Sequence, residues 1–378
     1  MESLRLAMRW DDFIGNHAVV GQLQRLAAAA RAQPGNVAMP FPTLVLAGPA
    51  GVGKSTLAFL LALALNCQTP PGPGGFCGRC ASCAAAVPLD QWPALLEAAL
   101  EHRAALVKSS AREAAPLCLA PHPAVRVYPP DGDFLSLPQA RAAIHQSRMH
   151  PDAGRTWTLI LPGLDRARWA TQAALLKTLE EPPPGVALVA LAQNPLALLP
   201  TVRSRALVLA LAPVGAAELA PSLAARLNLP LPQAELAARL AQGAPGRALG
   251  LDLEAYRQHR QQALELLAAG LAAGPAESIF RLSESTRADK EKFETLIEIL
   301  YSILQDIVAL QSGFSEAVRN VDSVPELTRM ARQVTPAGLV RLAEGLDRVQ
   351  SAARRNAFRP LALASWALGI APASPPAR

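Results

Sequence analysis

The sequence predicts an α/β nucleotide-binding domain followed by helical regions, and three observations support this fold class. First, the segment AGPAGVGKST at residues 47–56 has the spacing of a phosphate-binding loop. Second, apolar runs that are typical of strands alternate with helical segments over the first 212 residues, which indicates a parallel sheet covered by helices. Third, these runs stop at Pro213, and the remaining residues show only helical periodicity.

The size and composition indicate a multidomain globular protein. With 378 residues, the chain is too long for one ordinary core, and we expect two or three domains. Hydrophobic residues make up 51% and charged residues 17%, which excludes a disordered protein. No apolar run reaches the length of about 18 residues that a membrane span needs, and the N-terminus lacks a secretory signal, so we expect a cytoplasmic protein without a membrane partner.

The charge of the chain says little about its partners. The net charge of +6 allows contact with nucleic acid, but only five of the 36 basic residues are lysines, and these are scattered. No basic run or alternation of aromatic residues with arginine is present. The simpler interpretation is that the arginines are solvated on helix faces.

The phosphate-binding loop lies between an apolar run at 43–46 and a helical run at 57–65. In such a loop, glycines let backbone N–H groups converge on phosphate oxygens, a lysine reaches the terminal phosphates, and a hydroxyl ligates Mg²⁺. The pattern leaves open whether ATP or ADP is bound and whether Mg²⁺ accompanies it. The expected nucleotide-binding residues are Gly48, Gly51, Gly53, Lys54, Ser55 and Thr56.

Four of the five cysteines cluster within 17 residues, at Cys67, Cys77, Cys80 and Cys83. Four thiolates at short spacing in a reducing compartment predict a closed tetrahedral zinc site with a structural role. A redox pair and an iron–sulfur cluster are alternatives. A DNA-binding zinc module would need basic residues, and the cluster contains only Arg79. The fifth cysteine, Cys118, is interpreted as a small buried or incidental residue.

The first 212 residues are expected to form the α/β domain. Its predicted helices include 137–148 and 171–181, and the second of these ends at Pro182. The Ala- and Leu-rich segment 84–121, with a helix at 91–107, is interpreted as a surface insert without an assigned function. The predicted strands are 43–47, 124–128, 157–161, 186–192 and 206–211.

Helices are expected throughout the rest of the chain. Short helices with a turn at 243–246 predict a small domain at 213–253, and longer amphipathic helices predict a domain at 254–378. In the run 296–310, the apolar positions exceed one stripe, which indicates a helix that contacts neighbours on more than one side. The longer predicted helices are 253–271, 290–312, 325–334 and 335–353.

The acidic residues of an ATPase are missing from their expected place. A phosphate-binding-loop ATPase needs a carboxylate after a neighbouring strand to hold Mg²⁺ and position water. The strand 157–161 is followed by Pro162 and Gly163, neither of which can do so. Asp165 lies further along and is expected to cap the following helix. The sequence therefore predicts a nucleotide site without a hydrolytic partner.

The motifs and their order resemble the delta-prime subunits of the bacterial DNA polymerase III clamp loader, a branch of the AAA+ proteins. Nearly the whole chain takes part in the resemblance. Its strongest segment is ALLKTLEEPPPGVALVALAQNPLALLPTVRSR at 174–205. The other segments are WDDFIGN at 10–16, the phosphate-binding loop, the four cysteines, His122-Pro123, LPQARAAI at 137–144, GAPGRAL at 243–249 and EILYSILQDIVALQSG at 298–313.

The resemblance implies a RecA-like AAA+ domain with a parallel sheet and an inserted zinc module (residues 1–212, module 67–83), a small helical lid domain (213–253) and an all-α collar domain (254–378). It also implies that Arg205 is an arginine finger, which acts in trans on the nucleotide of a neighbouring subunit, with Arg203 as the rival. The family's serine–arginine–cysteine motif is Ser204-Arg205-Ala206 here, so its cysteine is absent. Asn194 stands nearest to the family's sensor position.

In the lid, the arginine of hydrolysing relatives falls at Gly246, next to Arg247. The expected function is therefore a non-hydrolysing or weakly hydrolysing stator subunit of the clamp loader. The implied partners are motor and clamp-opening subunits in a five-subunit ring, the sliding clamp, and primed DNA through the complex. The alternative is an autonomous ATPase, such as the motor subunit, and Pro162 and Gly163 argue against it.

Overall fold

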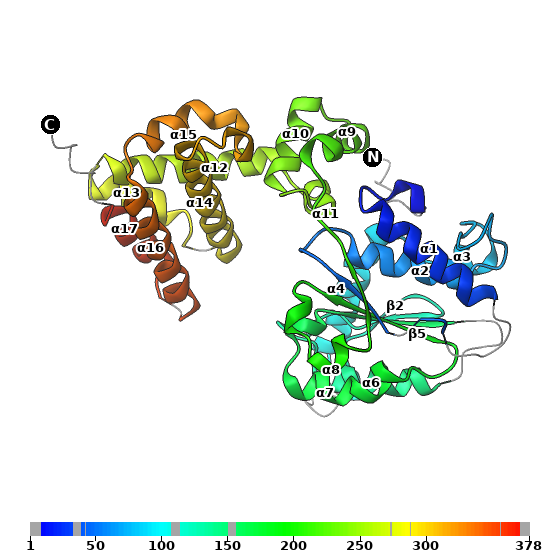
Figure 1. The fold of residues 1–378 in the computed structure, drawn as a ribbon. Helices are drawn as coiled ribbons and strands as arrows, with labels where there is room; N and C mark the ends of the chain where they lie inside the picture. Colours follow the sequence, from blue (N-terminus) through cyan, green and yellow to red (C-terminus); the bar gives the residue numbers. More distant parts are fainter. Residues whose placement is uncertain are drawn as a thin grey trace. The chain divides into compact units, whose positions relative to one another are not determined.

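The computed structural model describes residues 9–32, 39–41, 43–106, 114–149, 156–272, 274–287, 289–355 and 357–370. It divides into two compact units, of which unit 1 comprises Met1–Asn228 and Gly243–Arg247 and unit 2 comprises Leu229–Gln242 and Ala248–Arg378 (Figure 1). The two units divide the predicted lid segment 213–253 between them, and the three-domain division stays a prediction.

Unit 1 is built on a sheet that has six strands within the described residues, in the order β2-β3-β4-β5-β1-β6. All neighbours pair in parallel except β2, which is antiparallel to β3 at the edge. The predicted α/β fold is confirmed, and all five predicted strands are present; the predicted parallel sheet departs from the prediction only in the antiparallel edge strand β2. The strands are β1 Leu44–Ala47, β2 Leu119–His122, β3 Val125–Val127, β4 Trp157–Pro162, β5 Val186–Ala192 and β6 Leu207–Ala210.

Helices cover both faces of this sheet (Figure 1). In β1, Leu44 and Leu46 pack into the core with α1 (His17–Ala32) and α2 (Lys54–Asn66). Val45 and Ala47 belong to the core with α6 (Leu137–Arg148) and α7 (Trp169–Glu180). Successive side chains of a strand point to opposite faces, and burial of both faces explains the uninterrupted apolar sequence of β1 and β5.

The segment that was predicted as a surface insert packs against the core of unit 1. It begins at the last residue of α3 (Ala81–Ala84) and contains α4 (Trp92–Ala104), which corresponds to the predicted helix 91–107, although residue 107 lies outside the described residues. The ring of Trp92 meets the ring of Phe59 in α2 edge to face, with 4.9 Å between their centroids. The insert is thus a half-buried layer over α2.

Shorter elements complete unit 1. The 3-10 turns η3 (Leu164–Arg166) and η4 (Pro195–Ala197) follow β4 and β5, and α8 (Pro200–Arg203) precedes β6. Beyond β6 lie α9 (Ala216–Leu227) and the start of α11 (Pro245–Leu249). The turns η1 (Trp10–Asp12) and η2 (Leu89–Gln91) precede α1 and α4.

Unit 2 is helical in its described residues and is centred on α14 (Lys290–Gln311). This helix buries residues around much of its circumference and contacts α12, α15 and α16, as the apolar positions at 296–310 predict. No described helix combines the length and hydropathy that a membrane crossing needs. The other helices are α10 Leu231–Leu240, α12 Leu253–Leu271, α13 Ala276–Glu284, α15 Val324–Ala331, α16 Pro336–Arg354 and α17 Arg359–Leu368, with 3-10 turns η5 Ser315–Ala317 and η6 Val321–Ser323.

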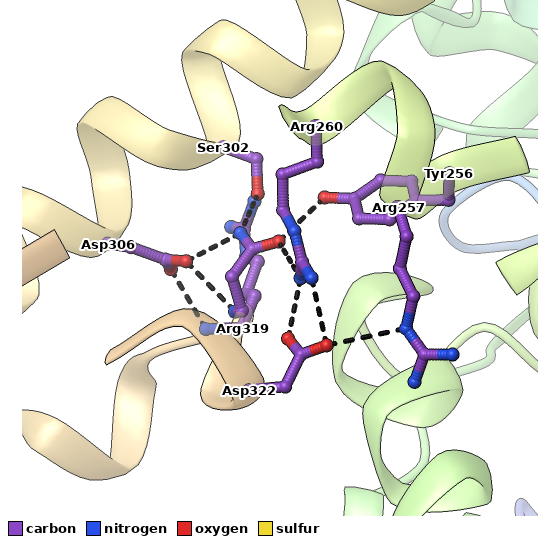
Figure 2. A network of polar contacts seen from close by, with 8 residues as sticks. Tyr256, Arg257, Arg260, Ser302, Asp306, Arg319 and Asp322 are labelled. Carbon is purple, nitrogen blue, oxygen red and sulfur yellow. Dashed lines mark hydrogen bonds and ion pairs between the residues drawn. The ribbon is translucent and has the colours of Figure 1, made fainter. Parts of the chain in front are cut away.

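A polar network joins α12 to η6 inside unit 2 (Figure 2). The buried guanidinium of Arg260 donates to both carboxylate oxygens of Asp322, at 2.6 and 2.8 Å, and to Asn320 Oδ1 at 3.1 Å. The hydroxyl of Tyr256 donates to the same amide oxygen at 2.9 Å, and Arg257 lies 3.5 Å from Asp322. The pairing of the charges and the hydrogen bonds of the polar atoms offset the free-energy cost of burying these groups.

The same network extends to α14. Asp306 is 1% exposed and accepts hydrogen bonds from the backbone N–H groups of Arg319 and Asn320, at 2.8 and 2.9 Å. The side-chain amide of Asn320 donates to Asp306 at 2.7 Å and to the hydroxyl of Ser302 at 3.3 Å. Asn320 is therefore the residue through which α12, α14 and the loop before η6 are held together.

Candidate nucleotide and metal sites

The phosphate-binding loop connects β1 to α2, and its glycines have backbone conformations that other residues rarely adopt. Gly53 is the N-cap of α2 with φ of 97°, and a Cβ there would lie 2.5 Å from the ring of Phe13. At Gly51, φ is 80° and a Cβ would lie 2.7 Å from the side chain of Arg247. The loop has the form that lets backbone N–H groups face phosphate at a helix N-terminus.

Lys54 begins α2, and its ammonium group is directed at the loop itself. Nζ donates to the carbonyl oxygens of Gly48 and Pro49, at 2.5 and 2.6 Å. Burial lowers the pKa of Lys54, and the nearby charge of Asp165 partly opposes this shift. A phosphate group would add a negative charge in direct contact with this half-buried ammonium, whose hydrogen bonds within the loop go to neutral carbonyl oxygens.

Ser55 and Thr56 follow Lys54 in the first turn of α2 and, with Gly48, Gly51 and Gly53, complete the predicted nucleotide site. The segment with α11 covers one side of the loop, because Gly246 N donates to Gly51 O at 2.8 Å. The structure therefore brings the predicted lid glycine and Arg247 next to the phosphate-binding loop. Assignment of these residues to a nucleotide stays a prediction.

The first two positions at the end of β4, Pro162 and Gly163, carry no carboxylate. Pro162 ends β4, and Gly163 follows with φ of 70°, in the left-handed region. A glutamate or aspartate at Gly163 would therefore adopt a strained backbone conformation. The left-handed backbone conformation after β4 therefore favours glycine over an acidic residue at position 163.

Asp165 has a different role from the one that the sequence predicts. Its Oδ2 accepts hydrogen bonds from the backbone N–H groups of Gln193 and Asn194, both at 2.9 Å. The expectation that it caps the following helix is wrong, since the N-cap of α7 is Arg168 and no side chain of the described residues caps this helix. Asp165 instead fixes the loop after β5, whereas Asn194 Oδ1 accepts from Leu196 N and caps η4. Sequence spacing gives no signal for a contact across 28 residues.

Arg203 is the last residue of α8, and Arg205 lies between α8 and β6. The Arg205 guanidinium is 3.4 Å from Glu180 Oε1 and 3.4 Å from the carbonyl oxygen of Thr201, and 53% of its side chain is exposed. Arg203 is the less exposed of the two. Long contacts at an exposed position contribute little stability, so the Arg205 side chain can extend to another molecule at small cost.

The four clustered cysteines converge in the structure, and their Sγ atoms all lie within 4.8 Å of one another. Cys67 caps the C-terminus of α2, Cys80 is the N-cap of α3, and Cys83 lies within α3. Zinc–sulfur bonds of about 2.3 Å place tetrahedral sulfurs about 3.8 Å apart. The 4.0 Å between the sulfurs of Cys67 and Cys80 is close to this value, so the cluster could hold zinc.

Hydrogen bonds already favour thiolate at one of these positions. The Thr69 hydroxyl and the backbone N–H of Arg79 lower the pKa of Cys77 to about 5. Burial raises the pKa of Cys67 and Cys83, which makes a cation in the cluster the natural source of compensating charge. All five cysteines are free thiols, and Cys118 lies outside the cluster.

Comparisons with known proteins agree with this architecture. A family model described as DNA polymerase III, delta subunit, matches residues 38–215, and another described as the C-terminal part of that subunit matches residues 255–370. DNA polymerase III subunit delta′ of Pseudomonas aeruginosa is 30% identical over 242 residues, which cover 62% of this chain and 64% of the relative. The chain thus matches slightly less than two thirds of the length of this curated relative.

Similar solved structures come from Thermotoga maritima. The RuvB Holliday junction branch migration motor is 17% identical with a TM-score of 0.42, over 88% of this chain and 94% of that one. A DNA polymerase III gamma subunit-related protein is 15% identical with a TM-score of 0.41, over 92% and 96%. At TM-scores this low, neither likeness carries a functional conclusion.

A phosphate-binding loop between the central strand β1 and a buried helix, in a mostly parallel sheet, defines a P-loop protein with the RecA-like fold of the AAA+ class. Together the two family models extend over most of the chain. The chain belongs to the family of delta-prime-type subunits of the DNA polymerase III clamp loader.

Proposed function

We propose that this protein is a stator subunit of a bacterial DNA polymerase III clamp loader that binds nucleotide but hydrolyses it weakly or not at all. The observation that carries the proposal is the contrast between the two halves of the site. The loop before α2 has the form of a phosphate cradle, whereas Pro162 and Gly163 stand where a hydrolytic site needs carboxylates. Family membership supports the clamp-loader role.

Within this role, Gly48, Gly51, Gly53, Lys54, Ser55 and Thr56 would hold the phosphates of ATP or ADP. Lys54 would exchange its two carbonyl partners for phosphate oxygens, and Ser55 would ligate Mg²⁺ if the ion accompanies the nucleotide. Cys67, Cys77, Cys80 and Cys83 would hold a structural zinc ion that fixes the loop after α2.

Arg205 would act on the nucleotide of a neighbouring motor subunit in a five-subunit ring. A guanidinium next to a γ-phosphate neutralises the charge that develops in the transition state and contributes about 10³–10⁵ to the rate at the site it serves. The half-exposed side chain of Arg205 and its long contacts with Glu180 and Thr201 support this assignment over Arg203. The ring would open the sliding clamp and load it on primed DNA.

ATP turnover by a reconstituted complex tests the role of Arg205. The complex contains this chain with motor and clamp-opening subunits, and the variants are Arg205→Ala, Arg203→Ala and the exposed control Arg141→Ala. Arg205→Ala should leave assembly intact and slow ATP hydrolysis, whereas Arg141→Ala should change neither. Unchanged turnover with Arg205→Ala would contradict the role in trans, and a loss confined to Arg203→Ala would reassign it.

A further inference from the structure

The four-cysteine cluster is formed by the end of α2, the start of α3 and the loop between these helices, which carries Cys77. Cys67 is fixed by α2, which is buried over most of its length, while Cys80 and Cys83 lie at the start and within the short helix α3. The turn is tight, because Ala84 N donates to Cys80 O at 2.8 Å and Cys83 N lies 3.5 Å from Cys80 Sγ. A metal ion can bind all four sulfurs only when α3 is held at a defined position relative to α2.

His122, at the end of β2, provides a contact that holds α3. Its side chain is buried, with 2% exposure, and Nδ1 accepts a hydrogen bond from Ala124 N at 3.0 Å. Because a backbone N–H can only donate, Nδ1 must be unprotonated and the ring proton is on Nε2. Nε2 lies 3.0 Å from the carbonyl oxygen of Ser82, so it donates to the backbone of α3 between Cys80 and Cys83.

A second contact joins the same strand to the segment that follows α3. Val87 N donates to Pro121 O at 2.8 Å, immediately before His122. The Ser82 hydroxyl also lies 3.1 Å from His122 Nε2. The short antiparallel strand β2 therefore supports α3 through the His122 side chain and the segment after α3 through a backbone hydrogen bond, while Cys67 is supported by α2.

We propose that His122 is a positioning residue for the metal ion, which acts by fixing Ser82 and thereby the sulfurs of Cys80 and Cys83. Ligand-orienting partners outside the coordination sphere commonly contribute 10–100-fold to metal affinity. The inference rests on the four-cysteine metal site of the proposed function and is independent of the clamp-loader role.

The test uses the full-length chain, Zn²⁺ competition against a chelator, and the absorption spectrum of the Co²⁺-loaded protein. His122→Ala should weaken Zn²⁺ binding by about tenfold or more and alter the thiolate-to-Co²⁺ bands. His122→Gln should recover much of the affinity, because its amide N–H can reach Ser82 O. Ser82→Ala should bind nearly as the unaltered chain does, since the carbonyl acceptor remains, and the exposed control His102→Ala should be unchanged.

Thermal unfolding with and without Zn²⁺ separates positioning from general stability. A positioning role predicts that His122→Ala reduces the increase in Tm that Zn²⁺ produces. A merely structural histidine would lower both Tm values equally, and that result, or a Zn²⁺ affinity and Co²⁺ spectrum like those of the unaltered chain, would overturn the proposal. Failure of the unaltered chain to bind either metal would refute the cysteine site and this inference with it, while leaving the clamp-loader role standing.

Discussion

At the scale of single residues, the side chain of Asp165 organises the edge of the sheet beyond β4. This side chain is 8% exposed, and one carboxylate oxygen accepts two backbone N–H groups after β5. The other oxygen has no hydrogen-bond partner among the described residues. The carboxylate thus joins the loop after β4 to the loop after β5, and it places a negative charge near Lys54.

Replacing Asp165 should therefore cost stability. Asp165→Ala leaves the N–H groups of Gln193 and Asn194 without their acceptor, and we expect a loss of about 2–3 kcal/mol in the free energy of unfolding. Asp165→Asn should cost less, because the amide oxygen can still accept both bonds. Urea unfolding measures the difference, with the exposed Asp133→Ala as the matched control. Equal stability of Asp165→Ala and the control would show that the contact contributes nothing.

The local structures that sequence reasoning located are those with local signals. Glycine and cysteine spacing located the phosphate-binding loop and the thiol cluster because both depend on short-range geometry. The roles of Asp165 and His122 depend on contacts across 28 and 40 residues, which no short pattern encodes. A buried histidine beside a proline is a weak signal in the sequence, and only the position of Ser82 gives it meaning.

At the scale of elements, periodicity predicted most of the long helices, although not α1, and the buried strands. The predictions 137–148, 186–192 and 253–271 coincide with α6, β5 and α12 because burial on one or both faces leaves a clear pattern. The strand β2 was not predicted, since it has four residues and contains Pro121. The helices α13 and α17 were also not predicted, since each is short and its apolar residues give no long repeat.

The network between α12 and η6 should make unit 2 sensitive to acid. Burial alone would raise the pKa of Asp322, but the hydrogen bonds and charge of Arg260 outweigh it, so the pKa lies below the ordinary value of 3.8. A carboxyl with a lowered pKa in the folded state contributes stability above the unfolded pKa, and this contribution is lost as the pH falls through the folded pKa. Asp322→Asn should therefore unfold more easily at pH 7 and show a smaller further loss near pH 3.

Removing the other partner tests the same network. Arg260→Ala leaves Asn320 and Asp322 without their buried donor, and we expect a loss of about 2–3 kcal/mol, moderated by the partial exposure of Asp322. The exposed pair Lys290–Glu294 in α14 provides a control, since Lys290→Ala should cost less than about 1 kcal/mol. Chemical denaturation at pH 7 compares them, and similar costs for the two substitutions would contradict the structural importance of the network.

At the scale of the whole molecule, α2 links the two candidate sites of unit 1. The helix begins at Lys54 in the phosphate-binding loop and ends next to Cys67 in the thiol cluster. Its 13 residues extend over about 20 Å, at about 1.5 Å per residue. A metal ion bound next to the C-terminus of α2 would therefore stabilise the helix that carries Lys54 at its N-terminus.

Metal removal should accordingly lower the stability of unit 1. We expect a chelator to decrease the Tm of the full-length chain, and Cys83→Ala to reproduce this decrease without the chelator. Cys118→Ala is the matched control, since this thiol lies outside the cluster and should leave the chelator effect intact. A chain that contains one zinc ion when purified but unfolds identically after its removal would contradict the structural role of the metal.

The most direct test of the central claim is steady-state ATP hydrolysis by the purified chain alone, alongside binding of ATP and ADP. The absence of carboxylates at Pro162 and Gly163 predicts nucleotide binding that Lys54→Ala weakens, with turnover no greater than that of the Lys54→Ala variant. Robust ATP turnover by the isolated chain that Lys54→Ala abolishes would contradict the account and identify the protein as an autonomous ATPase.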